Sequence, residues 1–147
     1  VLDGDVVRRG LGADLGYGPA DRRENIRRVG EVAKLFADAG LIAIVAMISP
    51  FRADRDRIRH SLQPGQFKEI FVNAPLDVCE RRDVKGLYAR ARANQLPEFT
   101  GISSPYEPPL AAELELRTDL TPLDDCLERL LTLVSAQLAP AAAAKGI

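Results

Sequence analysis

One stretch of this sequence limits the available folds more than any other: residues 41–48 are apolar throughout. A helical pattern precedes this run, with Ile26 and Val29 on one face, and a charged helical segment over residues 52–62 follows it. A strand without polar alternation is typical of a parallel sheet that is covered by helices on both faces. The run therefore predicts an α/β fold.

Strands and helices continue to alternate along the chain, as in βαβ units. Further strands are expected at residues 1–2, 69–72 and 114–116. A helix is expected to begin at an Asp21 cap with Glu24 in the capping-box position, and to end at Gly40. Other helices are predicted at 52–62, 76–82 and 122–138, and a basic, partly helical excursion at 83–94. The expected inward positions are Ile26, Val29, Ala33, Phe36, Leu123, Leu127, Leu130 and Val134.

Length and charge narrow the class of protein. The chain has 147 residues and a net charge of -1, which suits one domain and gives no reason to expect nucleic acid or a membrane surface as partner. We expect this domain to span 1–138 and a flexible tail to span 139–147. The two cysteines are far apart and His60 is the only histidine, which argues against a zinc site and favours free thiols in the cytoplasm.

Polar side chains follow the predicted strands. Asp3-Gly4-Asp5 comes after the first strand, Ser49 after the second and Asn73 after the third. The carboxyl ends of parallel strands share one edge of a sheet, where ligands bind. Asp3 and Asp5 could therefore bind Mg²⁺, and one of them could orient an attacking hydroxyl. The alternative is a turn with an Asp cap.

Arginines next to this edge suggest an anionic ligand. Arg22 and Asn25 are three residues apart in the first turn of one helix, so with Arg8 they could hold a phosphate or sulfate. A solvated face with surface ion pairs is the alternative.

Three further features each have two interpretations. The basic block at 81–92 suits a lid over phosphates or a solvated helix, and Phe99 could stack on a purine or anchor its loop. Ser49 could donate to a ligand or act as a nucleophile. No base stands beside it in sequence, so it could equally satisfy the end of its strand.

Taken in order, these segments resemble adenylyl-sulfate kinase over about residues 1–118. The motifs that carry the resemblance are LDGD, VRRGL, DLGY, DRRENIRRVGEVAKLFADAGL, ISPFRADR, APLDVCERRDVKGLYARARA, FTGI and SPYE. The resemblance implies a three-layer P-loop kinase fold with a mainly parallel sheet flanked by helices. It also implies an ATP-dependent transfer of the γ-phosphoryl group to the 3′-hydroxyl of adenosine 5′-phosphosulfate (APS), which yields 3′-phosphoadenosine 5′-phosphosulfate (PAPS) for sulfate assimilation.

The resemblance further implies roles for individual residues. Asp3, Asp5 and Ser49 would be the catalytic set, with Asp3 and Asp5 also serving Mg²⁺; the matching serine is described in the family as a phosphoserine intermediate. APS would be bound by Asp5, Arg8, Tyr17, Arg22, Asn25, Ile48, Ser49, Lys85 and Phe99. Tyr17 and Phe99 would sandwich the adenine, and Lys85 would reach down from the lid. A homodimer is implied, and fusion to or association with a sulfate adenylyltransferase is left open.

One expected motif does not occur in these residues. A phosphate-binding loop of the Gly-x-x-x-x-Gly-Lys-Ser/Thr type is absent from the 147 residues, and the first residue is Val1. We expect a strand, this loop and a helix to precede the chain, which would then be inactive by itself. The alternative is a non-catalytic APS-binding or regulatory module that has lost the loop.

Overall fold

The computed structural model describes residues 1–138, which form two compact units. Unit 1 comprises Val1–Phe67 and Val84–Pro109, and unit 2 comprises Lys68–Asp83 and the described residues from Leu110 onward. The expected tail at 139–147 lies outside the described residues. The extent of a single domain over 1–138 stays a prediction.

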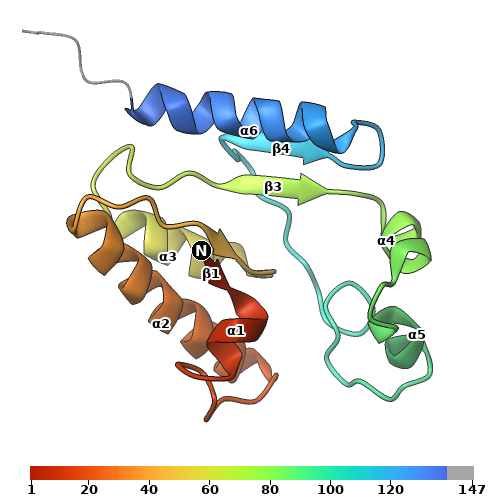
Figure 1. The fold of residues 1–147 in the computed structure, drawn as a ribbon. Helices are drawn as coiled ribbons and strands as arrows, with labels where there is room; N and C mark the ends of the chain where they lie inside the picture. The colour runs from red at the N-terminus through yellow and green to blue at the C-terminus, as the bar shows by residue number, and fades with distance from the viewer. Residues whose placement is uncertain (139–147) are drawn as a thin grey trace, which may run out of the picture. The chain divides into compact units, whose positions relative to one another are not determined.

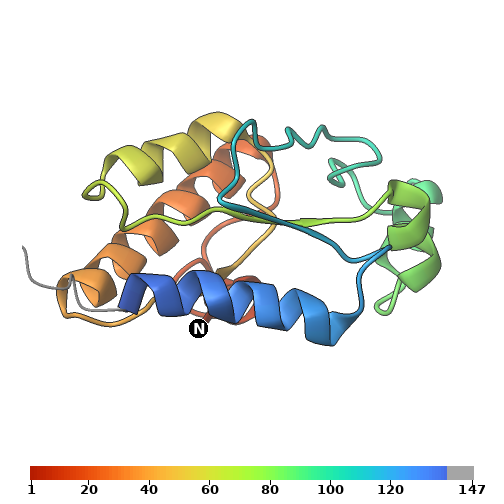
Figure 2. The ribbon, with the colours of Figure 1, turned by 90° about the horizontal axis from the view of Figure 1, so that it is seen from above.

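Unit 1 is built on a short parallel strand pair. Strand β1 (Leu2–Asp3) pairs in parallel with β2 (Val45–Ala46), and Asp3 lies opposite Ala46. Helices α1 (Gly4–Arg8), α2 (Pro19–Asp38), α3 (Arg52–His60) and α5 (Leu87–Arg92) complete the unit. In both views α2 and α3 lie side by side (Figures 1 and 2). The parallel pairing confirms the α/β class.

Strand β2 is shorter and more exposed than its sequence suggests. The prediction of a strand over 41–48 buried on both faces is wrong for the described residues, since Ile44 is 53% and Val45 42% exposed. Among those residues β2 has only β1 as a ladder partner. Apolar composition alone therefore could not tell how much of the run is paired and covered.

Helix α2 begins two residues before the expected cap. Pro19 occupies its first turn and Gly18 is the N-cap without a side-chain hydrogen bond, so the Asp21 capping prediction is wrong. Proline's fixed φ suits the first helical position, which moves the start upstream. The predicted end at Gly40 is confirmed: with φ +79° there, the Leu41 amide donates to the Phe36 carbonyl at 2.9 Å, as in a Schellman motif.

The buried face of α2 contains Ile26 and Val29, as predicted. The inward placement of Phe36 is wrong, since this residue is 41% exposed.

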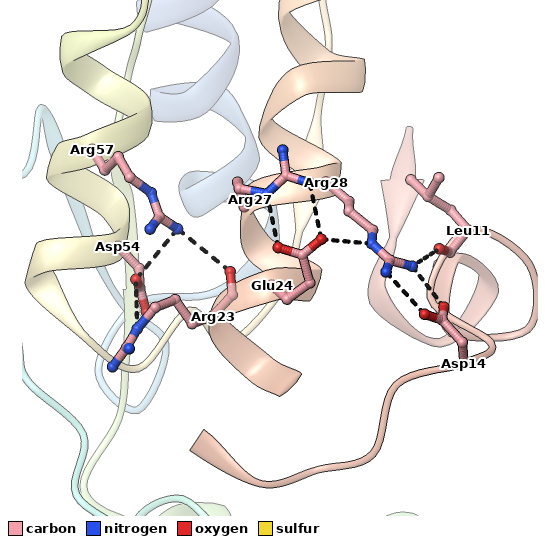
Figure 3. A network of polar contacts seen from close by, with 8 residues as sticks. All are labelled: Leu11, Asp14, Arg23, Glu24, Arg27, Arg28, Asp54 and Arg57. Atoms are coloured by element: carbon pink, nitrogen blue, oxygen red, sulfur yellow. Dashed lines mark hydrogen bonds and ion pairs between the residues drawn. The ribbon is translucent and has the colours of Figure 1, made fainter. Parts of the chain in front are cut away.

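A buried polar contact joins α2 to α3: Asp54, with only 4% of its side chain exposed, faces Arg23 at 3.6 Å and Arg57 at 3.5 Å (Figure 3). Two cations around one buried carboxylate compensate for much of its lost hydration.

A second network fixes the residues before α2. Glu24 accepts hydrogen bonds from Arg27 and Arg28, and Arg28 also donates to Asp14 at 2.6 Å and to the Leu11 carbonyl at 2.9 Å (Figure 3). Glu24 thus serves this network and not a capping box. The network ties the loop at 11–14 to the second and third turns of α2.

Unit 2 also contains a parallel strand pair. Strand β3 (Ile70–Asn73) pairs with β4 (Leu114–Arg117) along its whole length, and helices α4 (Leu76–Arg82) and α6 (Leu123–Leu138) follow the two strands. Helix α6 packs on β4 (Figure 1), with Cys126 and Leu116 buried. The inward placement of Leu123 and Leu127 is wrong, since they are 80% and 50% exposed.

No helix among residues 1–138 is both long and apolar enough to span a membrane.

Gly30 allows the close approach of α2 and α3. A Cβ at this position would lie 2.2 Å from Cδ1 and 2.9 Å from Cγ1 of Ile58. We predict that Gly30→Ala lowers the free energy of unfolding by about 1–2 kcal/mol, because overpacking costs more than the gain in helix propensity. Chemical denaturation measures the change. In an Ile58→Ala background the loss should vanish, and a stabilised Gly30→Ala single variant would contradict the prediction.

The Glu24 network predicts a pH dependence. Hydrogen bonds from Arg27 and Arg28 lower the pKa of Glu24 from 4.5 to about 2. A depressed carboxyl pKa contributes stability that is complete above pH 4.5 and is lost as the pH falls toward 2. A carbon-detected NMR titration should give Glu24 a midpoint near pH 2, and the melting-temperature difference between wild type and Glu24→Gln should shrink over the same interval. A Glu24 midpoint near 4.5 would disprove the contact.

Candidate functional site

Asp3 caps the helix that follows it. Its Oδ1 accepts hydrogen bonds from the amides of Asp5 at 2.9 Å and Val6 at 3.1 Å, at the start of α1. A turn with an Asp cap was the alternative that the sequence analysis offered for this segment; the cap is present, but it begins a helix that the sequence did not predict. The cap fixes the backbone of the Asp3-Gly4-Asp5 turn and the direction of the Asp3 carboxylate.

Asp5 forms an ion pair with Lys85, eighty residues later in the chain. This hydrogen bond and the charge of the partner lower the pKa of Asp5 and raise the pKa of Lys85. About two thirds of each side chain is exposed, so a ligand can reach both. The structure thus brings the acidic turn and the predicted lid lysine together.

Arg8 and Arg22 hold the segment that carries Tyr17. The Arg8 guanidinium lies 4.5 Å from the centre of the Tyr17 ring and donates to the carbonyls of Leu15 and Gly16. Arg22 Nε donates to the Tyr17 carbonyl at 2.7 Å. Tyr17 is 67% exposed as a residue, so a ligand can reach it.

Arg22 also binds the segment around Phe99. Its two terminal nitrogens donate to the Glu98 carbonyl and the Thr100 hydroxyl. Burial is the main cause of the lowered pKa of Arg22. The Phe99 ring packs edge-to-face against Tyr88 of α5, with ring centres 5.1 Å apart. One guanidinium therefore connects the two segments that carry the predicted adenine-stacking rings.

Asn25 lies on the buried face of α2, only 1% exposed. A Cβ at Gly12 would lie 2.5 Å from Asn25 Oδ1, and this oxygen has no hydrogen-bond partner among the described residues. Asn25 therefore packs against the Gly12 backbone, while Arg22, three residues earlier, reaches the neighbouring loops.

Ile48 and Ser49 follow β2. Ile48 is 65% exposed, and Ser49 has a φ of +43°, in the left-handed region. The Ser49 carbonyl accepts a hydrogen bond of 2.6 Å from Arg55 on α3. No sequence signal pointed to this role for Arg55, because it is one of several arginines in a charged helix.

The basic block at 81–92 is divided between the two units. In unit 2, Arg81 pairs with Asp77 at 2.6 Å and Arg82 donates to the Thr118 carbonyl at 2.7 Å. In unit 1, Lys85 pairs with Asp5 and Tyr88 contacts Phe99. Several of its side chains thus have partners within their own unit, so the block is not a uniform basic surface.

Asp3 and Asp5 are the candidate metal ligands. No group of three or more His, Cys, Asp or Glu side chains suited to a metal ion occurs within residues 1–138. Mg²⁺ commonly takes one or two carboxylates together with substrate phosphates and water, so a pair of aspartates is a sufficient protein contribution. The cap uses Oδ1 of Asp3 and the ion pair uses Oδ2 of Asp5, which leaves one oxygen of each outside these two contacts.

Comparison with known proteins places these residues in a family context. The family model described as adenylylsulphate kinase matches residues 1–117. The chain is 54% identical to a probable adenylyl-sulfate kinase of Halalkalibacterium halodurans and 56% identical to the adenylyl-sulfate kinase of Acaryochloris marina. These alignments cover 93% and 89% of this chain and 68% and 64% of the relatives, so the chain spans about two thirds of their length.

Solved structures agree with the sequence comparison. The Mycobacterium tuberculosis APS kinase CysC in complex with AMPPNP and APS superimposes with a TM-score of 0.85 at 46% identity, covering 91% of this chain and 78% of that one. A hexameric APS kinase from Thiobacillus denitrificans gives a TM-score of 0.65 at 31% identity, covering 92% of this chain and 22% of the other.

The role of Arg22 as a connection between two loops can be tested without a ligand. Arg22→Ala should make amide hydrogen exchange at residues 98–104 at least about tenfold faster, since a hydrogen bond from a charged group contributes about 1.5–3 kcal/mol. Mass spectrometry measures the exchange. Arg27→Ala, which removes an exposed arginine of the same helix, is the matched control. Equal exchange rates in wild type and Arg22→Ala would contradict the connection.

Proposed function

This chain belongs to the adenylyl-sulfate kinase family and has its fold, and we propose that the protein phosphorylates the 3′-hydroxyl of APS with ATP, giving PAPS for sulfate assimilation. The observation that carries the proposal is the position of Arg22. Arg22 donates hydrogen bonds to the segments that carry Tyr17 and Phe99, and Arg8 contacts the Tyr17 ring. Two aromatic rings and two guanidinium groups are thereby linked in one region. An adenine nucleotide with a phosphosulfate group needs both kinds of contact.

In this proposal, each residue of the acceptor site contacts a particular part of APS. Tyr17 and Phe99 stack on the adenine, and Arg8 and Arg22 bind the phosphosulfate. Ile48 and Ser49 contact APS from the end of β2, where Ile48 is exposed. Asn25 is proposed to contact the phosphosulfate together with Arg8 and Arg22; it is buried, and its Oδ1 has no hydrogen-bond partner among the described residues.

The phosphoryl-transfer side rests on Asp3, Asp5 and Lys85. A bound Mg²⁺ would supply positive charge that offsets the negative charge developing during phosphoryl transfer. Asp3 and Asp5 would hold this ion, because their carboxylates are the hard oxygen ligands that it prefers. Asp5 also orients the 3′-hydroxyl of APS. Lys85 neutralises Asp5 before substrates bind and is close enough to this turn to meet the transferred phosphoryl group.

Ser49 is proposed as a substrate contact, and the 3′-hydroxyl attacks the γ-phosphorus directly. The new O–P bond forms as the bond from the γ-phosphorus to the β–γ bridging oxygen breaks, so ADP leaves and the hydroxyl proton is released. The sequence offers no base next to Ser49, and the backbone carbonyl of Ser49 is engaged by Arg55. A phosphoserine intermediate is the alternative role for this residue. It would require an acceptor for the Ser49 hydroxyl proton.

We also propose a homodimer located in the cytoplasm. One relative is described as hexameric, so self-association occurs in the family, and sedimentation would give the state of this protein. Fusion to or association with a sulfate adenylyltransferase stays a hypothesis.

The full-length protein tests the function directly. Given ATP, Mg²⁺ and APS, it should form PAPS and ADP. Chromatography of the reaction mixture measures both products. Arg22→Ala should weaken APS binding by about 1.5–3 kcal/mol, the value of a hydrogen bond from a charged group. Calorimetry with APS measures this loss, and Arg27→Ala is the control that should bind normally. Unchanged APS affinity in Arg22→Ala would remove this residue from the site.

The 147 residues by themselves should not transfer phosphate, because they contain no Gly-x-x-x-x-Gly-Lys-Ser/Thr loop. The measurement is PAPS formation by the purified 147-residue chain, with the full-length protein as control. PAPS from the 147-residue chain would contradict the prediction. Conversely, a full-length protein that binds APS without forming PAPS would support the non-catalytic module, the alternative favoured by the absent motif.

A further inference from the structure

The backbone of Ser49 is in an unfavourable conformation. Its φ of +43° lies in the left-handed region, which a residue with a Cβ rarely adopts. Such a conformation persists only where the surrounding structure holds it. Ser49 lies directly after exposed Ile48 and before buried Pro50, at the end of β2.

Arg55 provides this hold. Arg55 belongs to α3 and is only 8% exposed. One terminal nitrogen donates to the Ser49 carbonyl at 2.6 Å, and the other donates to the Glu107 carbonyl at 2.7 Å. The planar guanidinium therefore fixes two backbone segments at a set distance, which a lysine ammonium cannot reproduce.

Further hydrogen bonds join the same two segments. The Glu107 amide donates to the Pro50 carbonyl at 2.8 Å, and Glu107 Oε2 accepts from the Arg52 amide at 2.8 Å. Arg52 also donates to the Pro108 carbonyl at 3.3 Å. The Ser49 turn is thus attached to the chain that follows the Phe99 loop.

That loop is itself closed by short backbone contacts. The amides of Ser103 and Ser104 both donate to the Phe99 carbonyl at 3.0 Å, and the Gly101 amide donates to the Ser104 carbonyl at 2.8 Å. Only two residues separate Ser104 from Glu107. A displacement of the Glu107 backbone would therefore move both the Ser49 turn and the Phe99 loop.

We propose that Arg55 is a positioning residue for the acceptor substrate: by bridging the Ser49 and Glu107 carbonyls, it fixes the Ser49 turn and the Phe99 loop in the arrangement that binds APS. This inference rests on the proposed function, since it needs Ser49 and Phe99 to contact APS. Arg55 does not touch the substrate in this role. It lowers the ordering cost of binding by holding both contacts in place beforehand.

Steady-state kinetics of the full-length protein test the role. Arg55→Lys keeps the charge but not the planar bridge, so the KM for APS should rise at least about tenfold while the KM for ATP stays within about twofold. Melting temperature is measured alongside. A purely structural role would lower the melting temperature and leave the KM for APS unchanged. Arg59→Lys, in the same helix and stacked on Phe67, is the matched control and should leave both KM values unchanged.

A second background shows whether Arg55 acts through Ser49. Glycine adopts a positive φ without strain, so in the Ser49→Gly background the further effect of Arg55→Lys should fall below about threefold. An equal effect in both backgrounds, or an unchanged KM for APS, overturns the inference. If the lysine variant does not fold, Arg55→Gln, which retains a planar donor, is measured by the same criteria.

The two proposals fail in different ways. A wild-type protein that forms no PAPS refutes the proposed function, and this inference with it. A wild-type protein that forms PAPS, combined with an Arg55→Lys variant of normal KM for APS, refutes only the role of Arg55.

Discussion

The candidate site depends on the hydrogen bonds of one guanidinium group. Arg22 is placed in the first turns of α2 and reaches Tyr17 on one side and Glu98 and Thr100 on the other. Residues more than seventy positions apart are thereby brought to one place. A lysine could satisfy only part of this set, because its ammonium group lacks the planar fork of arginine. The geometry of the two ring-bearing segments thus follows from where α2 begins.

The position of α2 depends in turn on ion pairs beside it, one of which involves the buried carboxylate of Asp54. Asp54 lies between Arg23 and Arg57, and Glu24 with Arg28 fixes the loop that precedes the helix (Figure 3). Gly30 lets α3 approach closely enough for these contacts. The same α3 carries Arg55, which bridges Ser49 and Glu107. Arg22 and Arg55, which serve the site, therefore lie on the same two helices as Arg23 and Arg57, which join those helices.

Much of the site could be predicted because its residues stand in ordered motifs along the chain. The sequence indicated Asp5, Arg22, Lys85 and Phe99, and the structure brings Asp5 to Lys85 and Arg22 to the residues beside Phe99. Their exact ligand roles are proposals. The sequence analysis did not identify Arg55, because sequence alone does not show which arginine of a charged helix is buried. It also misplaced Phe36 and Leu123, since helical periodicity identifies an apolar face but not what covers it.

The sequence by itself determined the family, the alternation of strands and helices, and the chemical types of the site residues. These properties follow from local patterns and motif order, which need no knowledge of distant contacts. Only the tertiary structure decided that Asp3 caps α1, that Lys85 neutralises Asp5, and that Ser49 is held by Arg55. Each of the last two contacts joins different segments of the chain, and the cap depends on a helix too short to show a period. Distances between segments are set by packing, which the order of residues does not state.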